Sequence, residues 1–118
     1  MEALRNDALV VRFGRGTLRI EHVRSQVSLC HEAQGFYGIS FYGDNDLALD
    51  EVCRLAGKPN RELRTSTVER LRGAGFKLER RGRYPHLTLR FEAEPSDEEL
   101  RAVEAEFDPP RKNPHPAD

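Results

Sequence analysis

Two alternating segments on either side of a glycine turn, residues 76–80 and 86–91, set narrow limits on the fold. The first reads FKLER, so apolar and charged side chains take turns along it. The second reads HLTLRF, which places Leu87, Leu89 and Phe91 on one side of an extended chain. Five residues lie between the segments, and the first three, RGR, carry the turn. The pattern predicts an antiparallel β-hairpin with one buried face.

The first forty residues divide into short elements. Residues 8–13 are rich in β-forming side chains and lead through a GRG turn into residues 17–21, which alternate. We therefore expect a hairpin at the start of the chain. The apolar spacing over residues 23–33 predicts a helix that ends at Gly35. Residues 36–42 contain four aromatic side chains and predict a strand.

Capping residues mark further helices. We expect Asp46 to cap a helix over residues 47–55, which Gly57 ends. Another helix is expected to begin near residues 65–67, whose sequence is TST. The SDEE segment that starts at residue 96 is a capping box and predicts the last helix.

These elements fit a single α+β domain over residues 1–108, with a mostly antiparallel sheet and helices packed on one face. A chain of 118 residues is long enough for one hydrophobic core. Four of the last ten residues are prolines, so we expect residues 109–118 to form an extended or disordered Pro-rich tail. No apolar stretch approaches the roughly 18 residues of a membrane span, and the first residues lack a signal peptide's apolar core. We expect a cytoplasmic protein whose two cysteines, Cys30 and Cys53, are reduced.

Charge is segregated along the chain, although the net charge is only −1. Residues 54–90 carry eleven Lys and Arg against three Glu, whereas residues 91–108 carry eight acidic residues against one Arg. Arginine suits bidentate contacts with phosphate, which favours a polyanionic partner. The alternative is that the basic and acidic segments lie against each other and form ion pairs of small individual worth.

His86 is the leading candidate for a catalytic residue. Strand alternation places it on a polar face with Thr88 and Arg90, opposite the apolar side chains. An imidazole there can move protons near neutral pH, while guanidinium groups hold a phosphate. The alternative is a histidine at a strand start without a role in catalysis. The candidate nucleic-acid-binding residues are Arg70, Arg80, Arg81, Arg83 and Arg90.

Other polar and aromatic clusters have simpler interpretations. His22 and His31 show no metal-ligand spacing with any carboxylate, so we expect structural roles. Residues 44–46, DND, lack the glycine and the closing glutamate of a calcium loop, which favours helix capping. The aromatic residues of 36–42 can stack on bases or fill the core, and on a half-buried strand core packing is favoured.

Residues 68–107 combine a short helix ending in LRGAGF, an arginine-bearing strand, a turn at Arg81 and Gly82, a histidine in the next strand, and a later helix. In these features the segment resembles the HicA-type mRNA interferase toxins. The resemblance implies a double-stranded-RNA-binding-like fold. It also implies sequence-relaxed cleavage of RNA with His86 as the acid/base and without a metal.

Together, the residues and the resemblance favour a small RNA-binding protein without a cofactor. Its specific form is a metal-independent ribonuclease toxin whose protein partner is an antitoxin. One alternative is a non-catalytic protein-interaction module that uses the aromatic strand and the tail. A further alternative is an ADP-ribosyltransferase-like protein, whose order of motifs is matched by Arg15, residues 65–67, Glu92 and Glu94. It ranks lower because residues 65–67 read as a helix start rather than a strand, and because the chain is short for that fold.

Overall fold

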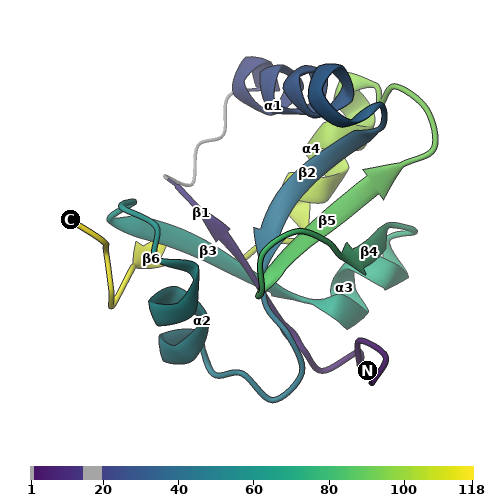
Figure 1. The fold of residues 1–118 in the computed structure, drawn as a ribbon. Helices are drawn as coiled ribbons and strands as arrows, with labels where there is room; N and C mark the ends of the chain where they lie inside the picture. The colour runs from purple at the N-terminus through teal and green to yellow at the C-terminus, as the bar shows by residue number, and fades with distance from the viewer. Residues whose placement is uncertain (1, 15–19) are drawn as a thin grey trace.

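Six strands form one antiparallel sheet in the computed structural model, which describes residues 2–14 and 20–118 (Figure 1). The strands are β1 Leu9–Phe13, β2 Tyr37–Tyr42, β3 Glu62–Thr67, β4 Lys77–Arg80, β5 His86–Phe91 and β6 Arg111–Lys112. Their order in the sheet is β4-β5-β2-β1-β3-β6, and every neighbouring pair is antiparallel. The α+β class and the antiparallel sheet predicted from the sequence are confirmed.

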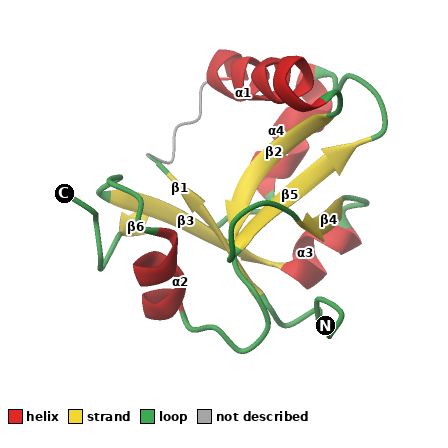
Figure 2. Cartoon of the chain, in the orientation of Figure 1, coloured by secondary structure: helices red, strands yellow, loops and turns green. Residues whose placement is uncertain are grey.

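Four helices pack against this sheet: α1 Ile20–Gln34, α2 Leu49–Ala56, α3 Val68–Gly73 and α4 Asp97–Ala105. α1, α3 and α4 cover one face and bury the main core against strand residues such as Phe41, Leu87 and Leu89. α2 stands apart from the other three, beside β1 and β3 (Figure 2). It packs on the opposite face of the sheet, where Val52 meets Val11 in a second, smaller core.

Several predicted elements occur where the sequence pattern places them. β4 and β5 form the expected hairpin, with Lys77 opposite Arg90. β2 is the expected aromatic strand, and α1 ends before Gly35, which has a left-handed φ of 81°. At the start of α4, the hydroxyl of Ser96 accepts a hydrogen bond from the Glu99 backbone N–H, and the Glu99 carboxylate accepts one from the Ser96 N–H. Local signals in the sequence are sufficient to predict these elements.

The hairpin expected at the start of the chain is wrong in its second half. Residues 20 and 21 belong to α1, and residues 17–19 lie outside the described residues. β1 pairs instead with β2 on one side and with β3 on the other. Ile20, Val23 and Val27 continue one apolar stripe of a helix that packs on the main core, so their burial favours helix over strand.

β3 was not predicted from the sequence, which indicates a helix start at residues 65–67 instead. Thr65 and Ser66 lie in β3 and are buried, and Thr67 ends the strand. The hydroxyl of Thr67 then caps α3 by accepting a hydrogen bond from the Arg70 N–H. β3 lies between β1 and β6, so backbone pairing on both sides stabilises it despite its polar side chains.

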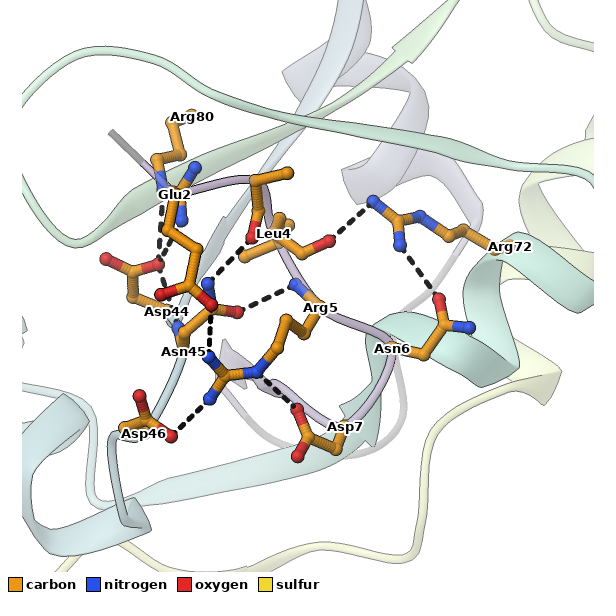
Figure 3. A network of polar contacts seen from close by, with 11 residues as sticks. Glu2, Leu4, Arg5, Asn6, Asp7, Asp44, Asn45, Asp46, Arg72 and Arg80 are labelled. Carbon is orange, nitrogen blue, oxygen red and sulfur yellow. Dashed lines mark hydrogen bonds and ion pairs between the residues drawn. The ribbon is translucent and has the colours of Figure 1, made fainter.

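Asp46 does not cap α2, contrary to the sequence-based expectation. The helix begins after Ala48, whose backbone N–H donates to the carboxylate of Glu51. Asp46 instead has a left-handed φ of 61° and forms an ion pair with Arg5 of the N-terminal segment (Figure 3). The backbone N–H of Arg5 also donates to the side chain of Asn45 at 2.7 Å. The DND loop therefore holds the N-terminal segment rather than a helix end.

The Pro-rich tail contains a short strand that pairs with the sheet. β6 pairs with β3, with Leu63 opposite Arg111. The next residue, Asn113, is fully buried, and its side-chain amide donates to the carbonyl of Asn60 at 2.8 Å. The prolines flank residues 111–113 and leave their backbone N–H groups free for pairing. Neither cysteine is in a disulfide, and no helix in the described part of the chain is long and apolar enough to cross a membrane.

Candidate functional site

β1 and β2 are neighbours in the sheet but touch at only one end. They share a single register pair, Val11 with Tyr42, whereas β1 pairs with β3 over five residues and β2 with β5 over six. From this point the two strands diverge toward α1 (Figure 1). A groove of about 500 Å³ lies here, lined by β1, β2, α1, the start of β5 and the chain before β3. Its volume is in the range of small-molecule sites.

His86 lines this groove and is held by both ring nitrogens. Nδ1 lies 2.6 Å from the backbone carbonyl of Arg81, and Nε2 lies 3.0 Å from the hydroxyl of Ser40. A carbonyl oxygen only accepts, so Nδ1 carries the hydrogen and donates it. In the neutral ring, Nε2 therefore has a free electron pair and accepts from Ser40. The basic nitrogen of His86 faces a hydroxyl group.

The polar face predicted for His86 is confirmed, and the structure adds residues from β2 to it. Leu87 and Leu89 are fully buried on the other face. Ser40 stands opposite Thr88 in the register and Tyr42 opposite His86, so these side chains share the face of His86. Neither Ser40 nor Tyr42 was predicted to lie beside His86, because strand register cannot be deduced from either strand alone.

Two cationic side chains, Lys58 and Arg12, line the groove together with Ser40 and His86. Lys58, in the chain before β3, lies with its ammonium group 5.2 Å from the centre of the Tyr42 ring. Arg12, from β1, is buried and donates from Nη1 to the backbone carbonyl of Ser40 at 3.0 Å. Ser40 thus contacts Arg12 through its carbonyl and His86 through its hydroxyl. The sequence signal for Arg12 was an arginine inside the apolar run LVVRF.

The five arginines predicted to bind nucleic acid do not form one cluster. Arg80 stands opposite Leu87 in the register, which directs it to the face away from His86. Its guanidinium binds the carboxylate of Asp44 at 2.7 Å (Figure 3). Arg70 lies on α3 and binds Asp108 at 2.8 Å. These two arginines have carboxylate partners within the fold.

Arg81, Arg83 and Arg90 lie closer to the expected arrangement. Arg81 and Arg83 are exposed in the turn that precedes His86, and Arg90 is exposed near the other end of β5. The guanidinium groups of Arg81 and Arg90 lie 4.4 and 4.8 Å from the centre of the Phe36 ring. These two cations cover and bury the Phe36 ring. Phe41 of the same segment packs in the main core, which confirms the core interpretation for that residue. Arg90 is also 3.5 Å from the carboxylate of Glu79.

Acidic side chains neutralise part of the basic segment, as the alternative interpretation of the charge pattern expects. Arg64 binds Glu104 at 2.6 Å, and Lys77 binds Glu92 at 3.0 Å. The groove differs from these surfaces, because no Asp or Glu occurs among the described residues that line it. Its polar and charged lining consists of Arg12, Gln26, Gln34, Ser40, Tyr42, Lys58, Asn60, His86 and Thr88.

The remaining histidines lie outside the groove lining. His31 stacks on Tyr37 with ring centres 4.2 Å apart, and His115 binds the carboxylate of Asp50 at 2.7 Å. His22 is exposed on α1. Within residues 2–14 and 20–118, no group of three or more His, Cys, Asp and Glu side chains is arranged to hold a metal ion.

The described residues that match the ADP-ribosyltransferase motif order do not lie together in one site. Residues 65–67 are the end of a strand and not only a helix start, which corrects one reason for ranking that alternative lower. Glu92 and Glu94 follow β5, which β2 and β1 separate from β3 in the sheet. Glu94 lies 3.9 Å from Arg24 of α1. Arg15 lies outside the described residues.

Comparison with known proteins gives no further guide to the site, since no family model, curated protein or solved structure matches the chain.

Proposed function

We propose that this protein binds RNA in the groove between β1 and β2 and that His86 acts there as the acid/base of metal-independent RNA cleavage. One observation carries the proposal. His86 presents its basic Nε2 to a hydroxyl in a groove that contains cations and, among its described lining residues, no carboxylate. A groove of this charge favours an anionic ligand, and the hydroxyl of Ser40 marks where a substrate hydroxyl can be deprotonated.

The chemistry follows from this arrangement. Nε2 of His86 takes the proton of a ribose 2′-hydroxyl that displaces the Ser40 hydroxyl, and the 2′-oxygen attacks the adjacent phosphorus. The bond from phosphorus to the 5′-oxygen breaks, which leaves a 2′,3′-cyclic phosphate and a 5′-hydroxyl end. The 5′-oxygen takes its proton from water, and the imidazolium returns its proton to the hydroxide that remains. Arg12 and Lys58 line the groove, where they can stabilise the negative charge that develops on the phosphate oxygens in the transition state.

Arg81 and Arg83 provide a second, exposed binding surface for the RNA backbone. Both lie in the turn before His86 and carry no carboxylate partner among the described residues. Replacing both by Ala should weaken the binding of single-stranded RNA. It should also reduce the slope of log K against log salt concentration by about 0.7 for each phosphate that is no longer neutralised. A non-catalytic protein-interaction module would show no such slope, and an unchanged slope would favour it.

A ribonuclease of this kind acts on cytoplasmic RNA and has to be controlled. We therefore keep the toxin form of the proposal, in which an antitoxin is the protein partner. Production of the protein without such a partner should inhibit bacterial growth, and His86→Ala should relieve the inhibition.

The decisive experiment compares His86→Ala with His22→Ala, which removes an exposed histidine on α1. Cleavage of a labelled RNA is followed in the presence of EDTA, with the ends of the products identified. A general acid/base contributes on the order of 10²- to 10⁴-fold, so His86→Ala should lose cleavage by that factor while RNA binding persists. His22→Ala should cleave like the parent. The proposal fails if the parent does not cleave RNA or if His86→Ala cleaves equally well.

A further inference from the structure

Arg12 is a buried cation whose direct contacts are all uncharged. Its side chain is 6% exposed, and its guanidinium donates to the carbonyl of Ser40 and to the side-chain oxygen of Gln26. The guanidinium carbon lies 5.6 Å from the centre of the Phe41 ring. The Nε–H is buried and has no hydrogen-bond partner among the residues that the structure describes. Within residues 2–14 and 20–118, Arg12 forms no ion pair.

The surroundings of Arg12 leave a positive charge uncompensated. Arg12 stands opposite Arg64 in the register of β1 and β3, so the two guanidinium groups lie on the same face. The nearby carboxylate is that of Glu104, which binds Arg64 at 2.6 Å. Burial lowers the pKa of Arg12, although the charge of Glu104 acts to raise it. The buried Arg12 and the partly buried Arg64 therefore share one anion, which is costly unless a further anion binds.

The groove has the composition that a phosphorylated ligand requires. Besides Arg12, the ammonium group of Lys58 lines the groove and supplies positive charge and hydrogen-bond donors. α1 adds apolar side chains to the lining: Leu29 is 61% exposed, and Ala33 lies one turn further on. An exposed leucine in the same groove as the cationic Arg12 and Lys58 fits a ligand that joins an anionic group to a flat, weakly polar ring system.

We propose that this groove is a nucleotide subsite in which Arg12 and Lys58 hold the phosphate group and the base lies against the Leu29 side of α1. The phosphate subsite rests on the buried charge of Arg12, and its assignment to a nucleotide rests on the proposed RNA function. The same phosphate chemistry can come from a diester within an RNA chain or from the monoester of a free mononucleotide.

The binding test uses the intact protein labelled with ¹⁵N and follows the side-chain Nε–H resonance of Arg12. Inorganic phosphate and uridine 3′-monophosphate should each shift this resonance in a saturable manner, and uridine should not. The nucleotide should bind at least several-fold more tightly than inorganic phosphate, because it also contacts the apolar side chains of α1. Following the parent protein avoids dependence on an Arg12 variant, whose folding the loss of a buried side chain can impair.

A matched pair of lysine variants supplies the control. Lys58→Gln should weaken binding of both phosphate probes about tenfold, while Lys112→Gln, in the exposed strand β6, should leave it unchanged. Equal weakening by both variants, or no movement of the Arg12 resonance at saturating phosphate, overturns the proposal.

Two further measurements separate this inference from the proposed RNA function. A short RNA that competes with uridine 3′-monophosphate and shifts the Arg12 resonance identifies the diester of an RNA chain as the natural ligand. Phosphate and nucleotide binding at Arg12 without RNA binding or cleavage supports the subsite and refutes the RNA function. RNA cleavage that depends on His86, with no response of Arg12 to any phosphate probe or to RNA, refutes the subsite and keeps the function.

Discussion

Gly43 allows β1 and β2 to meet closely at the lower end of the groove, and Gly43→Ala tests this crossing. A Cβ atom at this position would lie 2.0 Å from the backbone carbonyl oxygen of Leu9, at the start of β1. Approaches of a Cβ below 3.0 Å are essentially never adopted, so the two backbones would have to separate by at least 1 Å. The obstacle is main chain rather than a flexible side chain, and it cannot be relieved by a rotamer change.

The expected cost follows from this geometry. Overpacking typically costs about 1–3 kcal/mol, and a clash with the main chain of a central strand belongs at the upper end, about 3 kcal/mol. For 118 residues the unfolding entropy is about 0.25 kcal/mol per degree, so Tm should fall by about 12 °C.

The assay is urea and thermal unfolding of Gly43→Ala beside Gly73→Ala. Gly73 ends α3, has no positive φ, and would have no atom within 4 Å of an added Cβ. Alanine there should raise the free energy of unfolding by about 0.4–1 kcal/mol. A decrease of less than about 1 kcal/mol for Gly43→Ala would show that β1 and β2 do not cross as described, and the geometry of the groove would have to be revised.

Two other perturbations test the packing around the groove. Asn113→Ala removes a buried donor and acceptor from the docked tail and should lower the free energy of unfolding by about 2 kcal/mol. The control Lys112→Ala changes an exposed side chain and should alter the free energy of unfolding by no more than about 0.5 kcal/mol. Equal effects of the two variants in urea unfolding would contradict the docking. Burial would raise the pKa of Asp44, but hydrogen bonds from Arg80 and from the Asn45 N–H outweigh it and lower the pKa. The ionised carboxylate therefore contributes stability above the ordinary pKa of about 4, which is lost as pH falls through the lower folded-state pKa. Asp44→Asn should flatten this part of the profile of unfolding free energy against pH, and a profile identical to that of the parent would contradict the Asp44 pairing.

Elements with strong local signals could be predicted from the sequence. The alternation around Gly82 defines the β4–β5 hairpin, and with it the polar face that His86 shares with Thr88. The capping box at Ser96 defines the start of α4. In each case residues close in the chain make the interactions that stabilise the element, so no knowledge of distant segments is needed.

Elements that depend on distant partners could not be predicted in this way. β3 carries polar side chains and forms because β1 and β6 pair with it on both sides. The tail docks because Asn113 meets carbonyl groups some fifty residues earlier in the chain. Asp46 is drawn to Arg5, whose position depends on the path of the N-terminal segment. Such interactions appear only after the sheet has brought the segments together.

The candidate site also has features that the sequence predicts and features that depend on distant partners. Sequence alone determined that His86 begins a strand with a polar face and that arginines cluster before it. Tertiary structure decided which side chains meet at the groove: strand register turned Arg80 away toward Asp44 and set Ser40 against His86. It also placed Arg12 in the divergence between β1 and β2. The physical reason is that side-chain direction along one strand follows from local geometry, whereas the neighbours across strands follow from pairing between segments far apart in the chain.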